Sequence, residues 1–87
     1  MIKYTNGTGT NKRNAVKIIG AHGEFDGVDA EYRLLYLVFS IIKKDWMVLQ
    51  QELYLDRDRA YDRLVIEDSD GKVGDIWFDI SSFFGRI

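Results

Sequence analysis

The chain has 87 residues, of which 46% are hydrophobic and 30% are charged, and its formal net charge is −2. This length predicts one domain with a single modest core. The chain contains no cysteine, which excludes disulfide frameworks, thiolate metal sites, iron–sulfur clusters and a cysteine nucleophile, and which favours a reducing, cytoplasmic location.

The charges are unevenly distributed along the chain. Residues 1–23 carry four basic side chains and no acidic one, whereas residues 24–87 carry eight basic and fourteen acidic side chains. A basic arm on an acidic body predicts contact with phosphate or with an acidic partner, or neutralisation of its own domain. A nucleic-acid-associated factor is therefore one alternative function, although four scattered charges are well short of a nucleic-acid-binding patch.

The first ten residues are polar and glycine-rich, and they are expected to form a flexible lead-in without the apolar core of a signal peptide. In residues 11–19, Ala15, Ile18 and Ile19 have the i, i+3, i+4 spacing of a helix, and Gly20 can end it. The spacing predicts a short helix here. A strand over the segment AVKII is the alternative.

A long helix is predicted from Asp26, a suitable N-cap, to Lys44, which suits the negative end of the helix dipole. Its apolar residues cover more of the circumference than one buried face needs. The first stripe, which can cover a sheet, is Val28, Tyr32, Leu35, Phe39 and Ile42. The second stripe is Leu34, Leu37, Val38 and Ile41. We expect the short helix or a second copy of the chain to cover the second stripe, and a second copy would make the protein a homodimer.

After Asp45 the hydrophobic period changes to two in the segments WMVLQQELYLD, AYDRLVIED and VGDIWFDI, which predicts a three-stranded antiparallel meander. Ser81 or Ser82 can then cap a final turn that places Phe83 and Phe84 on the core. The longest apolar run, LLYLVF, is too short to span a bilayer. The predicted fold is α+β, with two N-terminal helices, the second long, packed on a three-stranded antiparallel β-meander in one domain over residues 1–87.

The segment DSDGK, residues 68–72, resembles the start of a calcium-binding loop. In that frame Ile66 and Trp77 would occupy ligand positions, and neither side chain can bind calcium. As a hairpin with a three-residue loop at residues 69–71, the segment instead pairs Leu64 with Ile76 and keeps one face apolar. We therefore predict a bulged hairpin turn.

The same register predicts a far face of the sheet that is rich in aromatic and charged side chains. This face has two interpretations. It stabilises the sheet through cross-strand pairs, or it binds a partner, because exposed Trp, Tyr and Arg often form interface hot spots. The candidate partner-binding residues are Tyr54, Tyr61, Arg63, Trp77 and Asp79.

The sequence offers little that resembles catalytic chemistry. His22, Glu24 and Asp26 alternate, so in an extended segment they would point one way and could hold magnesium or manganese. A small metal-dependent hydrolase is thus the second alternative function, although Asp26 is also the expected N-cap. No phosphate loop or nucleophile elbow is present, so no catalytic residue and no cofactor are expected.

The favoured function is that of a small non-catalytic interaction module. It would be an inhibitor-, immunity- or adaptor-like factor of bacterial or phage type, or an oligomerising subunit. Its expected partner is another protein or a second copy of itself, and not a membrane.

Overall fold

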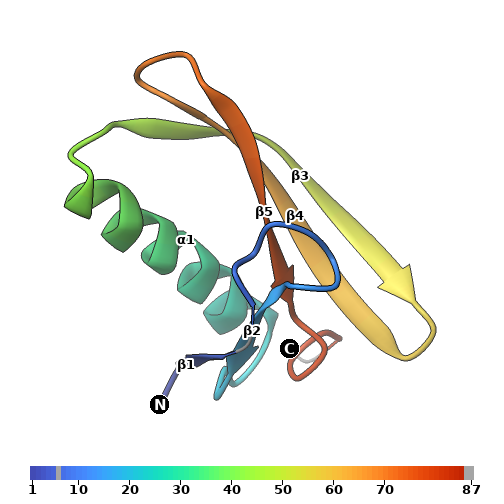
Figure 1. Ribbon diagram of the computed structural model, residues 1–87. Coiled ribbons are helices and arrows are strands. Elements are labelled where there is room, and N and C mark those ends of the chain that lie inside the picture. The colour runs from blue at the N-terminus through green and yellow to red at the C-terminus, as the bar shows by residue number, and fades with distance from the viewer. Residues whose placement is uncertain (6, 86–87) are drawn as a thin grey trace.

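The computed structural model describes residues 1–5 and 7–85, and in them one helix lies on one face of a five-stranded mixed sheet (Figure 1). The helix is α1 (Glu24–Ile41), and the strands are β1 (Lys3–Thr5), β2 (Val16–Ile19), β3 (Trp46–Asp56), β4 (Arg59–Asp68) and β5 (Val73–Asp79). The strand order is β1-β2-β5-β4-β3. The β2–β5 pair is parallel, and the β1–β2, β3–β4 and β4–β5 pairs are antiparallel.

The prediction of two N-terminal helices on a three-stranded meander is wrong, because the described residues contain one helix and five strands. The segment expected as the first helix contains a turn and then β2, which was the alternative. The strand is favoured because Val16 and Ile18 both enter the core as alternate residues, at 8% and 0% exposure. As a strand, β2 also pairs on both edges, with β1 at Tyr4 and with β5 at Phe78.

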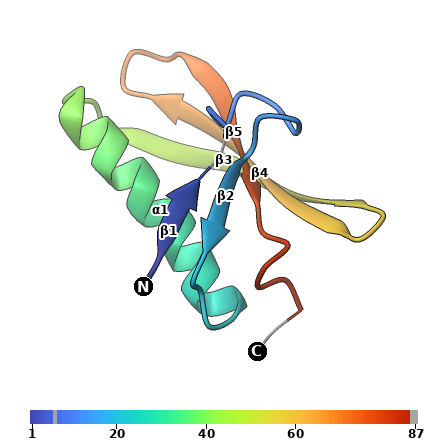
Figure 2. The same ribbon diagram turned by 60° about the horizontal axis from the view of Figure 1, so that its bottom comes forward.

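The segment expected as a flexible lead-in contains β1. Tyr4 lies opposite Ile18 in the β1–β2 pair. Its hydroxyl also donates a 2.6 Å hydrogen bond to the backbone oxygen of Ala30 in α1. Figure 2 shows β1 and β2 side by side next to the helix. Residues 3–5 therefore join the sheet to α1.

The predicted meander and the register of its second hairpin are confirmed. Leu64 pairs with Ile76, and Arg63 pairs with Trp77. Gly71 has a φ of 80°, and the turn closes through hydrogen bonds between the backbone groups of residues 68, 71 and 72. Glycine suits this left-handed position because it has no Cβ.

The helix begins slightly earlier than predicted, after Gly23, and its buried residues are Gly27, Ala30, Glu31 and Leu35. The side chain of Phe83 fills the space beside Gly27, where a Cβ would lie 2.2 Å from its ring. Phe83 is 1% exposed, whereas Phe84 is 38% exposed. The predicted C-terminal turn therefore places Phe83, but not all of Phe84, on the core.

The core lies between the helix and the sheet. It comprises Val16, Ile18, Ala30, Leu35, Ala60, Leu64, Ile66, Phe78, Ile80 and Phe83. In both ribbon views the β3–β4 hairpin projects beyond the helix (Figures 1 and 2), and Leu53 and Leu55 are accordingly half-exposed or more. No helix within residues 1–5 and 7–85 is long and apolar enough to cross a membrane.

Candidate functional site

A groove of about 310 Å³ lies between the C-terminal half of α1 and the first half of β5. Most of the side chains that line it are apolar. They come from α1 (Leu35, Val38, Phe39), from β4 and the turn after it (Ile66, Asp68, Lys72) and from β5 (Val73, Gly74, Asp75, Ile76). The groove therefore combines an apolar helix wall with a stretch of strand.

Within residues 1–5 and 7–85, no strand lies beside residues 73–76 on the edge of β5 that faces away from β4. Among the described residues, β2 pairs with β5 only at Phe78 and Asp79, and one further bond runs from the Trp77 N–H to the Gly9 oxygen at 2.8 Å. Alternate residues of an antiparallel strand direct their N–H and C=O groups to opposite edges. Because Trp77 bonds away from β4, the backbone groups of Val73 and Asp75 also point to the open edge.

The open edge exists because the chain turns away before β2. A continuation of β2 towards its N-terminus would have covered it, but residues 11–14 form a turn. In this turn the Asn14 N–H donates to the backbone oxygen of Asn11 at 3.1 Å and to its Oδ1 at 2.9 Å. Gly9 has a φ of 78°, and a Cβ there would lie 2.7 Å from Cγ1 of Ile76. Glycine thus lets the loop approach β5 at one point and leave it again.

One end of the groove is held by ion pairs, whereas its middle is open. At the end near the hairpin turn, the ammonium of Lys44 lies 2.6 Å from the carboxylate of Asp70 and 3.8 Å from that of Asp68. These ion pairs fix the turn to the end of α1. In the middle, a Cβ on Gly74 would meet no atom within 4 Å. The strand therefore leaves free space above Gly74.

Sequence reasoning did not find this groove, although one pattern pointed towards it. A glycine inside a strand often marks a place where another backbone or a ligand approaches closely, and Gly74 is such a residue. The pattern did not identify the open edge itself, because that edge depends on how far β2 extends beside β5.

Three of the five predicted partner-binding residues, Tyr54, Arg63 and Trp77, contact one another on the far face of the sheet. The rings of Tyr54 and Trp77 have their centroids 4.8 Å apart, and the guanidinium of Arg63 lies 5.9 Å from the Trp77 centroid. Arg63 also pairs with Asp75 at 2.7 Å and with Glu52. The hydrogen bonds that Arg63 donates to the carboxylates of Asp75 and Glu52 raise its pKa. Its charge is therefore already satisfied within the sheet.

The remaining two residues of that set are also in internal contacts. Tyr61 lies 6.0 Å from the ammonium of Lys12, measured to its ring centroid. Asp79 is only 4% exposed; its carboxylate accepts hydrogen bonds from Arg59 and from the Ser81 N–H. The far face thus has the cross-strand contacts of the stabilising interpretation, and partner binding by it remains a prediction.

The four residues of the predicted dimer stripe differ in their exposure. Leu34 packs against the core, whereas Leu37 is 57%, Val38 42% and Ile41 72% exposed. Val38 borders the groove beside β5. Leu37 and Ile41 therefore remain as large apolar side chains that are more than half exposed.

The candidate metal-binding residues do not form a site. The chain enters α1 at Glu24, so His22, Glu24 and Asp26 do not share one extended segment. The Asp26 carboxylate accepts a hydrogen bond from the backbone N–H of His22 at 3.1 Å. Nowhere in residues 1–5 and 7–85 do three His, Asp or Glu side chains come close enough to hold a metal ion.

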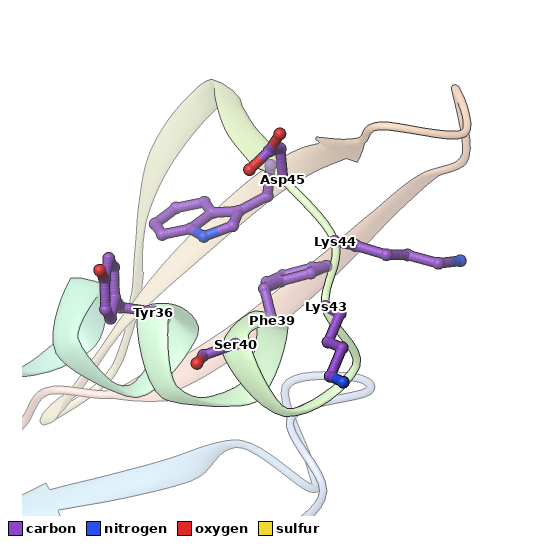
Figure 3. Close-up of a pocket in the computed structure, with 7 residues that line it drawn as sticks. Tyr36, Phe39, Ser40, Lys43, Lys44 and Asp45 are labelled. Atoms are coloured by element: carbon purple, nitrogen blue, oxygen red, sulfur yellow. The ribbon is translucent and has the colours of Figure 1, made fainter.

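A second hollow, of about 220 Å³, lies at the C-terminal end of α1 (Figure 3). Phe39 stacks on Trp46 there, with centroids 5.7 Å apart. Figure 3 shows Lys43, Lys44 and Asp45 pointing in different directions. These ionisable groups do not converge, so the hollow does not offer an acid–base pair.

Besides Asp79, two acidic side chains are buried outside the groove. Glu31 is 0% and Asp62 is 5% exposed. Neither carboxyl oxygen of Glu31 has a hydrogen-bond partner among the described residues, while Asp62 accepts a 3.3 Å hydrogen bond from Gln51. Burial, and after it the neighbouring Asp62, raise the pKa of Glu31 to about 10. Glu31 is therefore protonated at neutral pH.

One pattern in the sequence points to the buried acid. Glu31 lies four residues after Gly27 and four before Leu35, which places it on the same side of the helix as these buried residues. An acidic residue within a buried stripe predicts a perturbed pKa.

Comparison of the chain with protein-family models, with curated proteins and with solved structures finds no match. The function is therefore inferred from the geometry described above.

Proposed function

We propose that this protein is a non-catalytic interaction module that binds an extended segment of another protein as an added strand on β5. The observation that carries the proposal is the open backbone edge of Val73 and Asp75 beside an apolar groove. Strand addition of this kind obtains affinity from main-chain hydrogen bonds and specificity from pockets for alternate side chains.

The bound segment would form up to about four backbone hydrogen bonds, with the N–H and C=O groups of Val73 and Asp75. One or two of its side chains would enter the groove above Gly74 and contact Leu35 and Val38, and apolar side chains suit these neighbours. Each hydrogen bond contributes about 0.5–1.5 kcal/mol and each buried aliphatic side chain about 1.5–3 kcal/mol. After the cost of association, a micromolar dissociation constant is expected.

Neither alternative function is favoured by a specific observation. In the basic arm, the ammonium of Lys12 pairs with Asp56 of its own domain at 3.2 Å, which supports neutralisation rather than phosphate binding. The metal-dependent hydrolase would need a metal site that His22, Glu24 and Asp26 do not form. The absence of cysteine in the sequence still supports a cytoplasmic location as part of the proposal.

The test is a selection from a library of displayed random peptides, followed by binding measurements on the selected synthetic peptides. Asp75→Pro removes an N–H that makes no bond to β4, and Asp75→Ala removes the same side chain but keeps that N–H. We expect Asp75→Pro to weaken peptide binding at least about tenfold. Asp75→Ala should change binding less than about threefold. Both variants lose the Asp75 side chain, but only Asp75→Pro also loses the backbone N–H that bonds the peptide.

Gly74→Val provides a second variant, because a Cβ at residue 74 meets no atom within 4 Å and the valine side chain can enter the groove. It should fold and also lose peptide binding. The proposal is overturned if the selection yields no binding peptide, or if the selected peptides bind the Asp75→Pro and Gly74→Val proteins as tightly as the wild type.

A further inference from the structure

The outer side of α1 carries large apolar side chains that the described chain leaves uncovered. Phe25 is 92%, Tyr36 72%, Leu37 57% and Ile41 72% exposed. Single exposed apolar residues are ordinary on protein surfaces, but a group of them on one element marks an interaction surface. This surface is separate from the groove beside β5, because none of these four residues lines that groove.

The shape of this side of the helix fits another helix. A hollow of about 400 Å³ is lined by Arg33, Tyr36, Leu37 and Ser40, with Leu34 and Tyr4 beside them. The first four residues have the spacing i, i+3, i+4, i+7. Four residues with this spacing surround the hole that receives a side chain, or knob, from a facing helix in coiled-coil packing.

The charges of the helix select an antiparallel second copy. The first half of α1 is acidic, with Glu24 and Asp26 in its first turn, followed by the exposed Asp29, which pairs with Arg33 of the same helix. Lys43 and Lys44 follow the last turn. A parallel pair would place acidic ends together, whereas an antiparallel pair places each acidic end beside the basic end of the other copy.

We infer that the protein forms a homodimer in which two α1 helices pack antiparallel about a twofold axis between Tyr36 and Leu37. The midpoint of the four-residue hole coincides with this axis. Leu37 of each copy then lies beside the axis and packs against Tyr36 of the other copy, and Asp29 lies near the lysines that follow the other helix. Lys43 is the available partner, since the ammonium of Lys44 is bound to Asp70, and Lys43 takes part in none of the ion pairs among the described residues.

The dimer is expected to be weak. A standard protein interface buries about 800 Å² on each partner, and one pair of helices gives less contact than that. A dissociation constant of roughly 10–100 µM is consistent with an interface at the low end of this range.

Sedimentation velocity of the whole chain from about 5 to 500 µM tests the inference, over a range that brackets the expected dissociation constant. Leu37→Glu should give a monomer at every concentration, because it brings two carboxylates together at the twofold axis. Leu37 is 57% exposed, so the melting temperature should change little. If this variant is nevertheless destabilised, Tyr36→Glu, at a residue that is 72% exposed, serves the same purpose.

A charge exchange identifies the antiparallel arrangement. Asp29→Lys alone and Lys43→Asp alone should each raise the dissociation constant about threefold to tenfold, since two symmetric ion pairs are lost per dimer. The combined variant should return it to within about threefold of the wild type. Aspartate is tolerated at residue 43, whose φ is 56°, better than most residues are.

A wild type that remains monomeric at about 500 µM overturns the inference, since that concentration lies above the expected dissociation constant. The inference is also overturned if the Leu37→Glu and Tyr36→Glu variants still dimerise. It is overturned as well if the variant that combines Asp29→Lys with Lys43→Asp dimerises no better than either single variant. Asp75→Pro, which addresses the groove beside β5, should leave the dimer unchanged. Failure of peptide binding and failure of dimerisation are therefore distinguishable.

Discussion

Replacing Glu31 with glutamine is expected to stabilise the protein at neutral pH. The pKa of Glu31 is raised from 4.5 to about 10 in the folded chain, first by burial and then by Asp62. Between these two values the folded state holds one proton more than the unfolded state. The free energy of unfolding therefore falls by about 1.4 kcal/mol for each unit by which the pH rises.

The contribution of Glu31 is complete below its unfolded pKa and is lost as the pH rises towards its folded pKa. From the unfolded pKa to pH 7 the loss amounts to about 3 kcal/mol. Glutamine has nearly the same volume as the protonated acid and does not titrate. Glu31→Gln should thus regain about 3 kcal/mol at pH 7 and about 1 kcal/mol or less near pH 5.

Urea unfolding followed by tryptophan fluorescence at several pH values between about 5 and 8 measures this difference. Glu24→Gln is the matched control, because Glu24 is an exposed acid in the same helix; it should keep the pH dependence of the wild type. If the unfolding free energies of wild type and Glu31→Gln stay parallel across this range, Glu31 is not a buried neutral acid and the reasoning is refuted.

Four further substitutions test the packing and the turns. Gly71→Val should lower the unfolding free energy by about 1–3 kcal/mol, because valine is strained at a φ of 80°; an unchanged melting temperature would contradict the bulged turn. Phe83→Ala should cost about 3–5 kcal/mol by calorimetry, and Gly27→Ala should be destabilising beside Phe83 but better tolerated beside alanine, which a double-mutant cycle would show. Tyr4→Phe should cost about 1 kcal/mol in urea unfolding, through loss of the bond to Ala30; no loss would show that β1 is not anchored to α1 by this bond.

The meander and the long helix could be predicted because their patterns are local. Alternation over residues 46–79 and the apolar stripes of residues 28–42 each lie within one stretch of sequence. In contrast, β1 has three residues and β2 has four, and over such lengths helical and extended spacings are hard to tell apart. Val16 and Ile18 became strand residues through pairing with Tyr4 and Phe78, which are distant in sequence.

The candidate site could be predicted only in part, for a related reason. The far-face residues Tyr54, Arg63 and Trp77 were placed together correctly because hairpin register determines which residues share a face. The groove beside β5 depends on where β2 stops pairing and on the turn at Asn11. Neither feature has a pattern of its own in the sequence, so only the unusual strand glycine, Gly74, pointed to it.

The parallel pairing of β2 with β5 has a consequence for the order in which the molecule folds. Its contacts join the two ends of the chain, as does the hydrogen bond from Ser82 to the backbone oxygen of Ile18, 64 residues away. Closing so long a loop costs more entropy than forming a hairpin. The β3–β4–β5 meander can therefore form first from near neighbours, and the β1–β2 hairpin docks on it last. During synthesis the apolar side of β2 stays exposed until β5 has been made. Premature association between unfinished chains would therefore begin at this short segment.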